Sequence, residues 1–241
     1  MERTAIFLAA MVPAVASLDN GVALLPSMGY ATWNDVGIDV NETQFLASCD
    51  ALVSTGLAAL GFTYCNLDEG WPSATREEPG GQIIADPDLF PSGMLAIADH
   101  LHSKGLQFGL YTDRGDLTCG GLPGSLGYEK QDAAQYADWE VDYVKEDNCH
   151  APGGPNDQEM QLQEFGLMRD ALNATGRPMV FAVCGGGGEP PWANLSYFAE
   201  PPFGAELANS WRIGPDTIGY ETMRHNLALD SILSPFAGPG G

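Results

Sequence analysis

The chain has 241 residues, enough for one sizeable hydrophobic core, as one large domain or two small ones. Lys and Arg total 10 against 32 Asp and Glu, so the formal net charge at pH 7 is −22. That charge repels nucleic acid and anionic membranes, which excludes both as expected partners and favours a neutral substrate.

The first residues predict a secretory signal peptide over residues 1–16. A charged start precedes an apolar run from Ala5 to Val12, which is too short to span a bilayer, and Ala14-Val15-Ala16 is a small-residue cleavage site. A buried helix is the alternative, but Pro13 would break it. N-glycosylation sequons, which fit the same route, begin at Asn41, Asn173 and Asn194. We therefore expect export, to the extracellular space or to a lysosome or vacuole, with residues 17–241 as the catalytic domain.

Strand-like runs alternate with helical patterns along the rest of the chain. The expected strands are Met28–Trp33, Tyr64–Asp68, Gln107–Tyr111, Tyr143–Glu146, Met179–Cys184 and Ser210–Arg212. The expected helices are Glu42–Leu60, Met94–Lys104, Lys130–Glu140, Asp157–Thr175 and Thr217–Ser234, identified by apolar residues spaced at three and four. This alternation predicts a parallel sheet, either doubly wound or closed into a barrel.

Polar residues gather where the expected strands end, which favours an α/β TIM (β/α)8-type barrel. The carboxyl ends of its parallel strands form the active-site face. The polar stretches are Trp33-Asn34, Asp68-Glu69, Tyr111-Thr112-Asp113, Lys145–Asp147 and Arg212–Asp216. No Gly-x-Gly-x-x-Gly motif follows the first strand, which argues against a dinucleotide-binding fold. A closed barrel needs eight strand–helix units, so we expect a barrel truncated to about six.

The fourth expected strand carries the most informative feature. Lys145 and Asp147 are two residues apart, so their side chains point to the same side of a strand. The cation favours the ionised form of the acid, which a nucleophilic or electrostatic carboxylate needs. A surface ion pair at a strand end is the alternative interpretation.

The same face fits a sugar substrate. Trp33 can stack on the apolar face of a hexose, and charged side chains can hold its hydroxyls through charge-assisted hydrogen bonds. The charged candidates are Asp68, Glu69, Lys145 and Arg212. Two further acids can cleave a glycosidic bond. Each residue alone also fits a structural role: Trp33 can belong to the core, and Arg212 can pair with a nearby carboxylate.

Five cysteines in an exported chain raise the question of pairing. Cys119 and Cys149 follow two adjacent strands, which brings their loops together and makes Cys119–Cys149 the expected disulfide. Cys49, Cys65 and Cys184 lie on a helix or in apolar strands, and we expect them to be buried thiols.

Short motifs follow one another along nearly everything after the signal peptide. The early motifs are Leu18-Asp19-Asn20-Gly21, Pro26-Ser27-Met28-Gly29-Tyr30, Trp33-Asn34 and Asn66-Leu67-Asp68-Glu69-Gly70-Trp71. The later motifs are Gly109-Leu110-Tyr111, Thr118-Cys119-Gly120-Gly121, Val141–Lys145 with Asp147 and Cys149, Trp211-Arg212 with Asp216, and Ala237-Gly238-Pro239-Gly240-Gly241. In this order they resemble glycoside hydrolase family 27, the α-galactosidase and α-N-acetylgalactosaminidase group.

The resemblance implies a TIM barrel followed by a small antiparallel β domain, and a retaining exo-glycosidase without metal or organic cofactor. It makes Asp147 the nucleophile and Asp216 the general acid/base, with carboxyl groups about 5–5.5 Å apart. Asp147 should be ionised beside Lys145, and Asp216 protonated for the first step through enclosure and the neighbouring carboxylate. The remaining implied contacts are Trp33 stacking, Asp68 and Glu69 at O4 and O6, Tyr111 lining the pocket, Lys145 at O3 and O4, and Arg212 at O2. Cys119–Cys149 matches a family disulfide.

Three positions depart from the family pattern. Family members usually carry Asp where Glu69 stands, and more often an aromatic residue where Glu146 stands. At Gly185, α-galactosidases typically carry a Glu that contacts O2, whereas N-acetyl-preferring relatives have small residues in this region. The sequence also ends where the family continues with further strand–helix units and the β domain. Because edge strands would then keep unpaired backbone groups, we expect the polypeptide as written to be poorly stable or to aggregate.

Three functions follow from these observations. The leading one is a retaining α-galactosidase that acts on galactosyl oligosaccharides or glycoconjugates. The second is an α-N-acetylgalactosaminidase or transglycosylase on the same scaffold, separated from the first by which sugar is released from aryl glycosides. The third is a catalytically silent sugar-binding fragment, which would bind sugar without turnover. A homodimer is left open.

Overall fold

The computed structural model describes residues 20–153, 157–185, 207–212 and 214–233. The expected signal peptide, the sequon at Asn194 and the motif that begins at Ala237 lie outside these residues. Within the described residues, no helix is long and apolar enough to cross a membrane.

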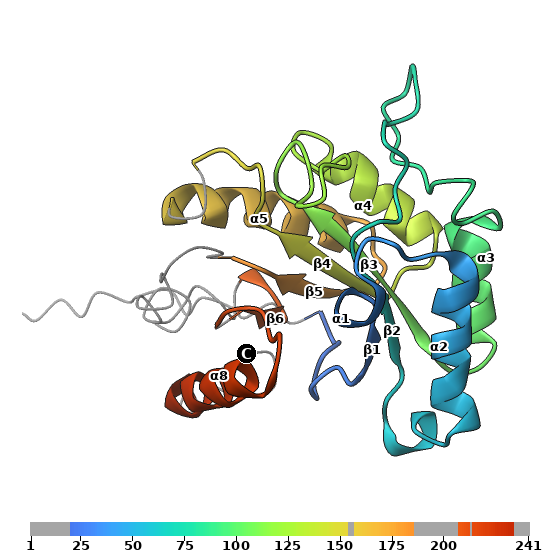
Figure 1. Ribbon diagram of the computed structural model, residues 1–241. Coiled ribbons are helices and arrows are strands. Elements are labelled where there is room, and N and C mark those ends of the chain that lie inside the picture. Colours follow the sequence, from blue (N-terminus) through green and yellow to red (C-terminus); the bar gives the residue numbers. More distant parts are fainter. Residues whose placement is uncertain (1–19, 154–156, 186–206, 213, 234–241) are drawn as a thin grey trace, which may run out of the picture.

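Six parallel strands form one curled sheet, the predicted partial barrel (Figure 1). They are β1 (Gly29–Ala31), β2 (Tyr64–Leu67), β3 (Gln107–Asp113), β4 (Tyr143–Asp147), β5 (Val180–Val183) and β6 (Ser210–Trp211). Each strand pairs with its neighbour in the chain, and the order β1 to β6 never reverses. A doubly wound sheet would show a reversal of strand order, so this alternative is excluded and the prediction of a truncated TIM-type barrel is confirmed.

Helices cover the convex side of the curl, with α8 beyond β6 (Figure 1). The helices are α1 (Trp33–Val36), α2 (Glu42–Ser54), α3 (Gly93–His102), α4 (Glu129–Asp138), α5 (Gln158–Ala174) and α8 (Tyr220–Leu233), with a 3-10 turn at Ala58–Leu60. The side chains of Asn41 and Asp157 accept hydrogen bonds from N–H groups of the first turns of α2 and α5, which fixes where these helices begin. The single helix expected over Glu42–Leu60 is interrupted, because Gly56 takes a positive φ of 82° after α2.

Alternation along the strands separates a packed outer layer from the inside of the curl. On β3, Phe108 and Leu110 are buried toward the helices, and the ring of Phe108 lies 6.1 Å from that of Phe45 on α2. Tyr111 has the opposite parity and faces inward beside Lys145, its partner in the β3–β4 register. The outer face therefore carries the hydrophobic core, and the inner face is left for polar side chains.

Residues before β1 tie the start of the described chain to the far end of the sheet. The Asn20 side chain donates to the carbonyl oxygen of Met179 at 2.8 Å and accepts from the amide of Asn209 at 3.0 Å. These contacts join segments 159 and 189 residues apart in the sequence. The curl of the sheet is thus held at its amino-terminal side.

Two disulfides are present, one more than expected. Cys119–Cys149 forms as predicted, and Cys184 is a buried free thiol, also as predicted. The expectation of free thiols at Cys49 and Cys65 is wrong, because these residues form a disulfide with Cα atoms 5.9 Å apart. Both side chains are fully buried where α2 packs on the outer face of β2, so the inward face of the helix meets an outward residue of the strand.

The pairing predicts one reactive thiol per chain when the oxidised protein is denatured without reductant. Cys184 should supply it, so Cys184→Ser should leave none. Titration with an aromatic disulfide reagent measures the number directly. A count of three in the wild type would contradict the Cys49–Cys65 bond.

Candidate active site

The carboxyl ends of the strands surround a pocket of about 500 Å³. Every side chain predicted for catalysis or sugar binding lines it: Trp33, Asp68, Glu69, Tyr111, Lys145, Asp147, Arg212 and Asp216. These residues come from, or directly follow, strands β1, β2, β3, β4 and β6, and the disulfide Cys119–Cys149 forms part of the wall. Residues spread over more than 180 positions of sequence are therefore gathered around one space.

Lys145 joins two acids of this pocket. Its ammonium group donates to Asp68 at 2.7 Å, lies 3.8 Å from a carboxylate oxygen of Asp147, and stands 4.8 Å from the ring centre of Tyr111. Burial disfavours the ammonium charge, but Asp68 and Asp147 raise the pKa of Lys145 above its ordinary value. The side chains of Asp68 and Asp147 are only 9% and 15% exposed. A surface ion pair, the alternative interpretation of Lys145 and Asp147, is therefore excluded.

Glu69 is held by the loop that carries Cys119. Its two carboxylate oxygens accept hydrogen bonds from the hydroxyl of Thr118 at 2.9 Å and from the N–H of Gly120 at 3.0 Å. A Cβ atom at Gly120 would lie 2.8 Å from the side chain of Ile38 and 3.0 Å from that of Glu69, so any larger residue would have to displace these side chains. Glu69 is expected to bind sugar, but here both of its oxygens are engaged by protein groups.

Asp216 lies at the open side of the pocket. Its side chain is 67% exposed and accepts a hydrogen bond from Arg212 at 2.7 Å. Arg212 also donates to the carbonyl oxygen of Gly214 at 2.6 Å and to the sulfur of Cys184 at 3.2 Å. The expected enclosure of Asp216 is not observed, because β6 is the last strand among the described residues and no further strand end covers this side.

Several residues around the pocket were not assigned a role from the sequence. The pocket is also lined by Asn148, Pro215, Ile218 and Thr222. No motif or spacing in the sequence identifies these four residues as part of a site. Asp113 stands behind the wall and is fully buried. The sequence could have pointed to Asp113, because it stands two residues after Tyr111 and both side chains therefore lie on the inner face of β3.

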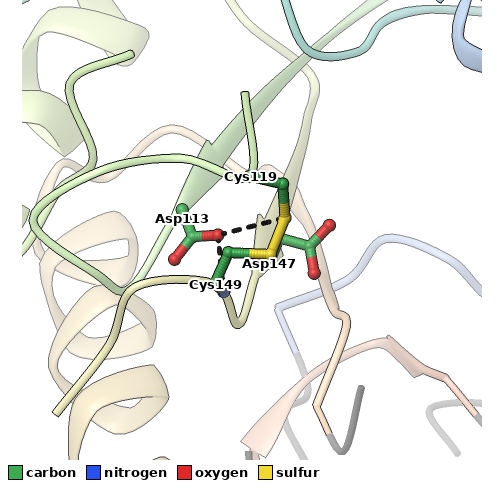
Figure 2. A group of neighbouring side chains, drawn as sticks. All are labelled: Asp113, Cys119, Asp147 and Cys149. Carbon is green, nitrogen blue, oxygen red and sulfur yellow. Dashed lines mark hydrogen bonds between the residues drawn. A yellow bond between two sulfur atoms is a disulfide. The ribbon is translucent and has the colours of Figure 1, made fainter. Parts of the chain in front are cut away.

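Asp113, Asp147 and the disulfide form a compact group (Figure 2). One oxygen or sulfur atom from each of Asp113, Cys119, Asp147 and Cys149 lies within 4.8 Å of the others. Metal binding by cysteine requires thiolates, and these two sulfurs are bonded to each other, so the group is not a cysteine–carboxylate metal site. Burial and the nearby charge of Asp147 raise the pKa of Asp113 to about 8, although two backbone N–H groups and Arg114 favour its ionised form.

Comparison with known proteins gives one consistent result. The model of the family described as alpha galactosidase A matches residues 26–213. A Dictyostelium discoideum protein named "Probable alpha-galactosidase" is 43% identical over 228 residues, which cover 94% of this chain and 55% of that protein. The alpha-galactosidase of Cyamopsis tetragonoloba is 40% identical, over 92% of this chain and 51% of its own length.

Solved structures agree with the sequence comparison. The alpha-galactosidase of Saccharomyces cerevisiae with raffinose has a TM-score of 0.80 and 33% identity, covering 94% of this chain and 53% of that one. Alpha-galactosidase I of Mortierella vinacea has a TM-score of 0.74 and 39% identity, covering 82% and 47%. The chain thus spans about half the length of the relatives that it matches.

Glu146, between Lys145 and Asp147, points to the other side of β4. It is fully buried, and among the described residues neither of its carboxyl oxygens has a hydrogen-bond partner. Burial raises its pKa well above the ordinary 4.5, and the acids Asp113, Glu129 and Glu164 add to the effect, while Arg114 opposes it. The folded protein therefore keeps this proton to a higher pH than the unfolded chain does.

Glu146→Gln is expected to stabilise the fold at neutral pH by roughly 1–3 kcal/mol, because it removes the need to bury an unpaired charge or carry an extra proton. The stability due to protonated Glu146 is fully present below its unfolded pKa and is lost as the pH rises toward the folded pKa. The gain should therefore vanish below about pH 4. Urea unfolding at several pH values measures it, with the exposed Glu159→Gln on α5 as control. A gain that does not change with pH would contradict the assignment.

Proposed function

Because this chain belongs to the alpha-galactosidase A family, we propose that it acts, within its whole protein, as a retaining exo-glycosidase on terminal α-D-galactosyl residues. The observation that carries the proposal is the pocket itself. Asp147 and Asp216 line it together, with Lys145 beside Asp147 and Trp33 at 42% exposure as an aromatic surface. The proposed substrates are galactosyl oligosaccharides or glycoconjugates, and the proposed route is the secretory pathway.

The reaction proceeds in two displacements. In the first, an oxygen of Asp147 attacks the anomeric carbon, the glycosidic bond breaks, and Asp216 gives its proton to the leaving oxygen. In the second, Asp216 takes a proton from water, which attacks the same carbon and releases Asp147 as a carboxylate. Two inversions retain the configuration. The ammonium group of Lys145 lies 3.8 Å from Asp147, and Lys145 together with Asp68, whose side chain is 9% exposed, would hold ring hydroxyls.

Substrate binding must change the pairing of Asp216. In the free protein its carboxyl group accepts a hydrogen bond from Arg212 at 2.7 Å, so this oxygen is not free to face a leaving group. A sugar hydroxyl at O2 would accept from Arg212 in place of Asp216. The same event then enables Asp216 to bind the proton that the first displacement requires.

Hydrolysis of p-nitrophenyl α-galactoside across acidic to neutral pH tests the proposal. Asp147→Asn should lose activity by roughly 10³-fold or more, since no nucleophile remains. Asp216→Asn should behave differently: p-nitrophenolate leaves without protonation, so the first step persists and a glycosyl-enzyme accumulates as a burst. Equal activity in wild type and Asp147→Asn would sink the mechanism.

A folded wild type without activity would require a second assay. The same measurement on a chain extended by the C-terminal half of a relative distinguishes two cases. Activity gained by extension identifies the present chain as an incomplete catalytic unit. Sugar binding without turnover in both chains would support the silent sugar-binding alternative.

The preference for galactose or N-acetylgalactosamine bears on Gly185. This residue stands two positions after the end of β5 and offers no side chain toward O2, and Cys184 before it contacts Arg212. We expect galactose to be released faster than N-acetylgalactosamine from matched p-nitrophenyl glycosides, measured as the ratio of kcat/KM. A ratio in favour of the 2-acetamido sugar would assign the α-N-acetylgalactosaminidase alternative, and products longer than the substrate would indicate transglycosylation.

A further inference from the structure

Asp113 is a buried acid beside the nucleophile that the proposed mechanism does not use. It ends β3 and is paired in register with Asp147, the last residue of β4. Its side chain is fully buried and does not line the pocket, so it has no direct access to a bound sugar. Any influence on the reaction must pass through its neighbours.

The carboxyl group of Asp113 holds the beginning of two loops. One oxygen accepts the N–H of Gly115 at 2.8 Å, in the loop after β3, and the other accepts the N–H of Cys149 at 2.8 Å, in the loop after β4. The sulfur of Cys119 lies 3.7 Å from the second oxygen, so the disulfide closes over the same carboxylate (Figure 2). One buried group thus organises both segments that the disulfide joins.

The neighbouring Arg114 holds the residues that precede Cys149. Its N–H donates to the carbonyl oxygen of Asp147 at 3.1 Å, and its guanidinium donates to the side chain of Asn148 at 2.5 Å. Together with the Asp113–Cys149 bond, three consecutive residues, 147 to 149, are each fixed by residues 113 and 114. The N–H of Asn148 in turn donates to a carboxylate oxygen of Asp147 at 2.9 Å, so the orientation of this peptide sets that of the nucleophile.

We infer that Asp113 is a positioning residue for Asp147: by accepting the N–H of Cys149 it fixes the Asn148–Cys149 peptide, and through it the preceding Asp147–Asn148 peptide, whose N–H aims the nucleophilic carboxylate at the anomeric carbon. This inference rests on the proposed function. It gives a role in the reaction to Asp113, although this side chain is fully buried and does not line the pocket.

Asp113→Asn tests the inference, because the amide keeps one acceptor oxygen but turns an NH₂ group toward a backbone N–H. The matched control is Asp99→Asn, which makes the same chemical change at an exposed acid on α3 and creates no N-glycosylation sequon. Active sites are counted by complete labelling with a galactose-configured epoxide, detected by intact mass. We expect kcat per labelled site to fall by roughly 10- to 100-fold in Asp113→Asn, with the inhibition constant of free galactose unchanged. Asp99→Asn should match the wild type.

Each outcome separates the inference from the proposed function. If the wild type is labelled and Asp113→Asn has the same kcat per labelled site, Asp113 only stabilises the fold and the inference is overturned. If the wild type is neither active nor labelled at Asp147, also in the chain extended by the C-terminal half of a relative, the proposed function fails and the inference fails with it. Should Asp113→Asn fold poorly, Asp113→Glu keeps both acceptor oxygens. A positioning role predicts a higher kcat per labelled site for Glu than for Asn, and equal values would overturn it.

Discussion

The ammonium group of Lys145 is the interaction on which the pocket depends. It stands between Asp68 from the end of β2 and Asp147 from the end of β4, at 2.7 Å and 3.8 Å. Two carboxylates that face each other at low exposure would repel without a cation between them. The contact requires that β2, β3 and β4 run parallel and in order, because only then does an inward lysine on β4 reach across Tyr111 to the next strand end but one. The Lys145 contacts therefore depend on the parallel order of these three strands.

Positive charge is scarce in this chain, and its partly buried arginines each connect segments that are distant in the sequence. With 10 Lys and Arg against 32 acids, few carboxylates can be paired. Arg76 reaches the fully buried Asp132 of α4 with two short hydrogen bonds, and Arg177 joins Asp142 to the backbone just before β4. Loss of Arg76 would leave the fully buried Asp132 without its cation, which is costlier than loss of a surface pair. Glu146 forms no hydrogen bond or ion pair with a cation among the described residues, and protonation takes the place of pairing.

The sequence predicts well what depends on periodicity and less well what depends on distances between elements. The six strands and their inward residues follow from alternation and from the rule that strand ends share one face. The Cys49–Cys65 bond could not be predicted in this way, because it depends on how closely α2 packs on β2. The exposure of Asp216 depends on what lies beyond β6, and the engagement of Glu69 depends on the path of the loop at Thr118 and Gly120. None of these is encoded in a local pattern.

The two sides of the pocket differ in how firmly they are built. Around Asp147, a disulfide, the loop that holds Glu69 and the hydrogen bonds of Asp113 leave little freedom to the backbone. Around Asp216, the chain between β6 and α8 is held by side-chain hydrogen bonds such as Asn226 to Pro215, and Ile218 is 85% exposed. The loss of conformational entropy on ligand binding would then occur mainly in the segment around Asp216. In the proposed mechanism that side meets the leaving group, so the pocket formed by the described residues would discriminate strictly among glycones while accepting aglycones of varied shape.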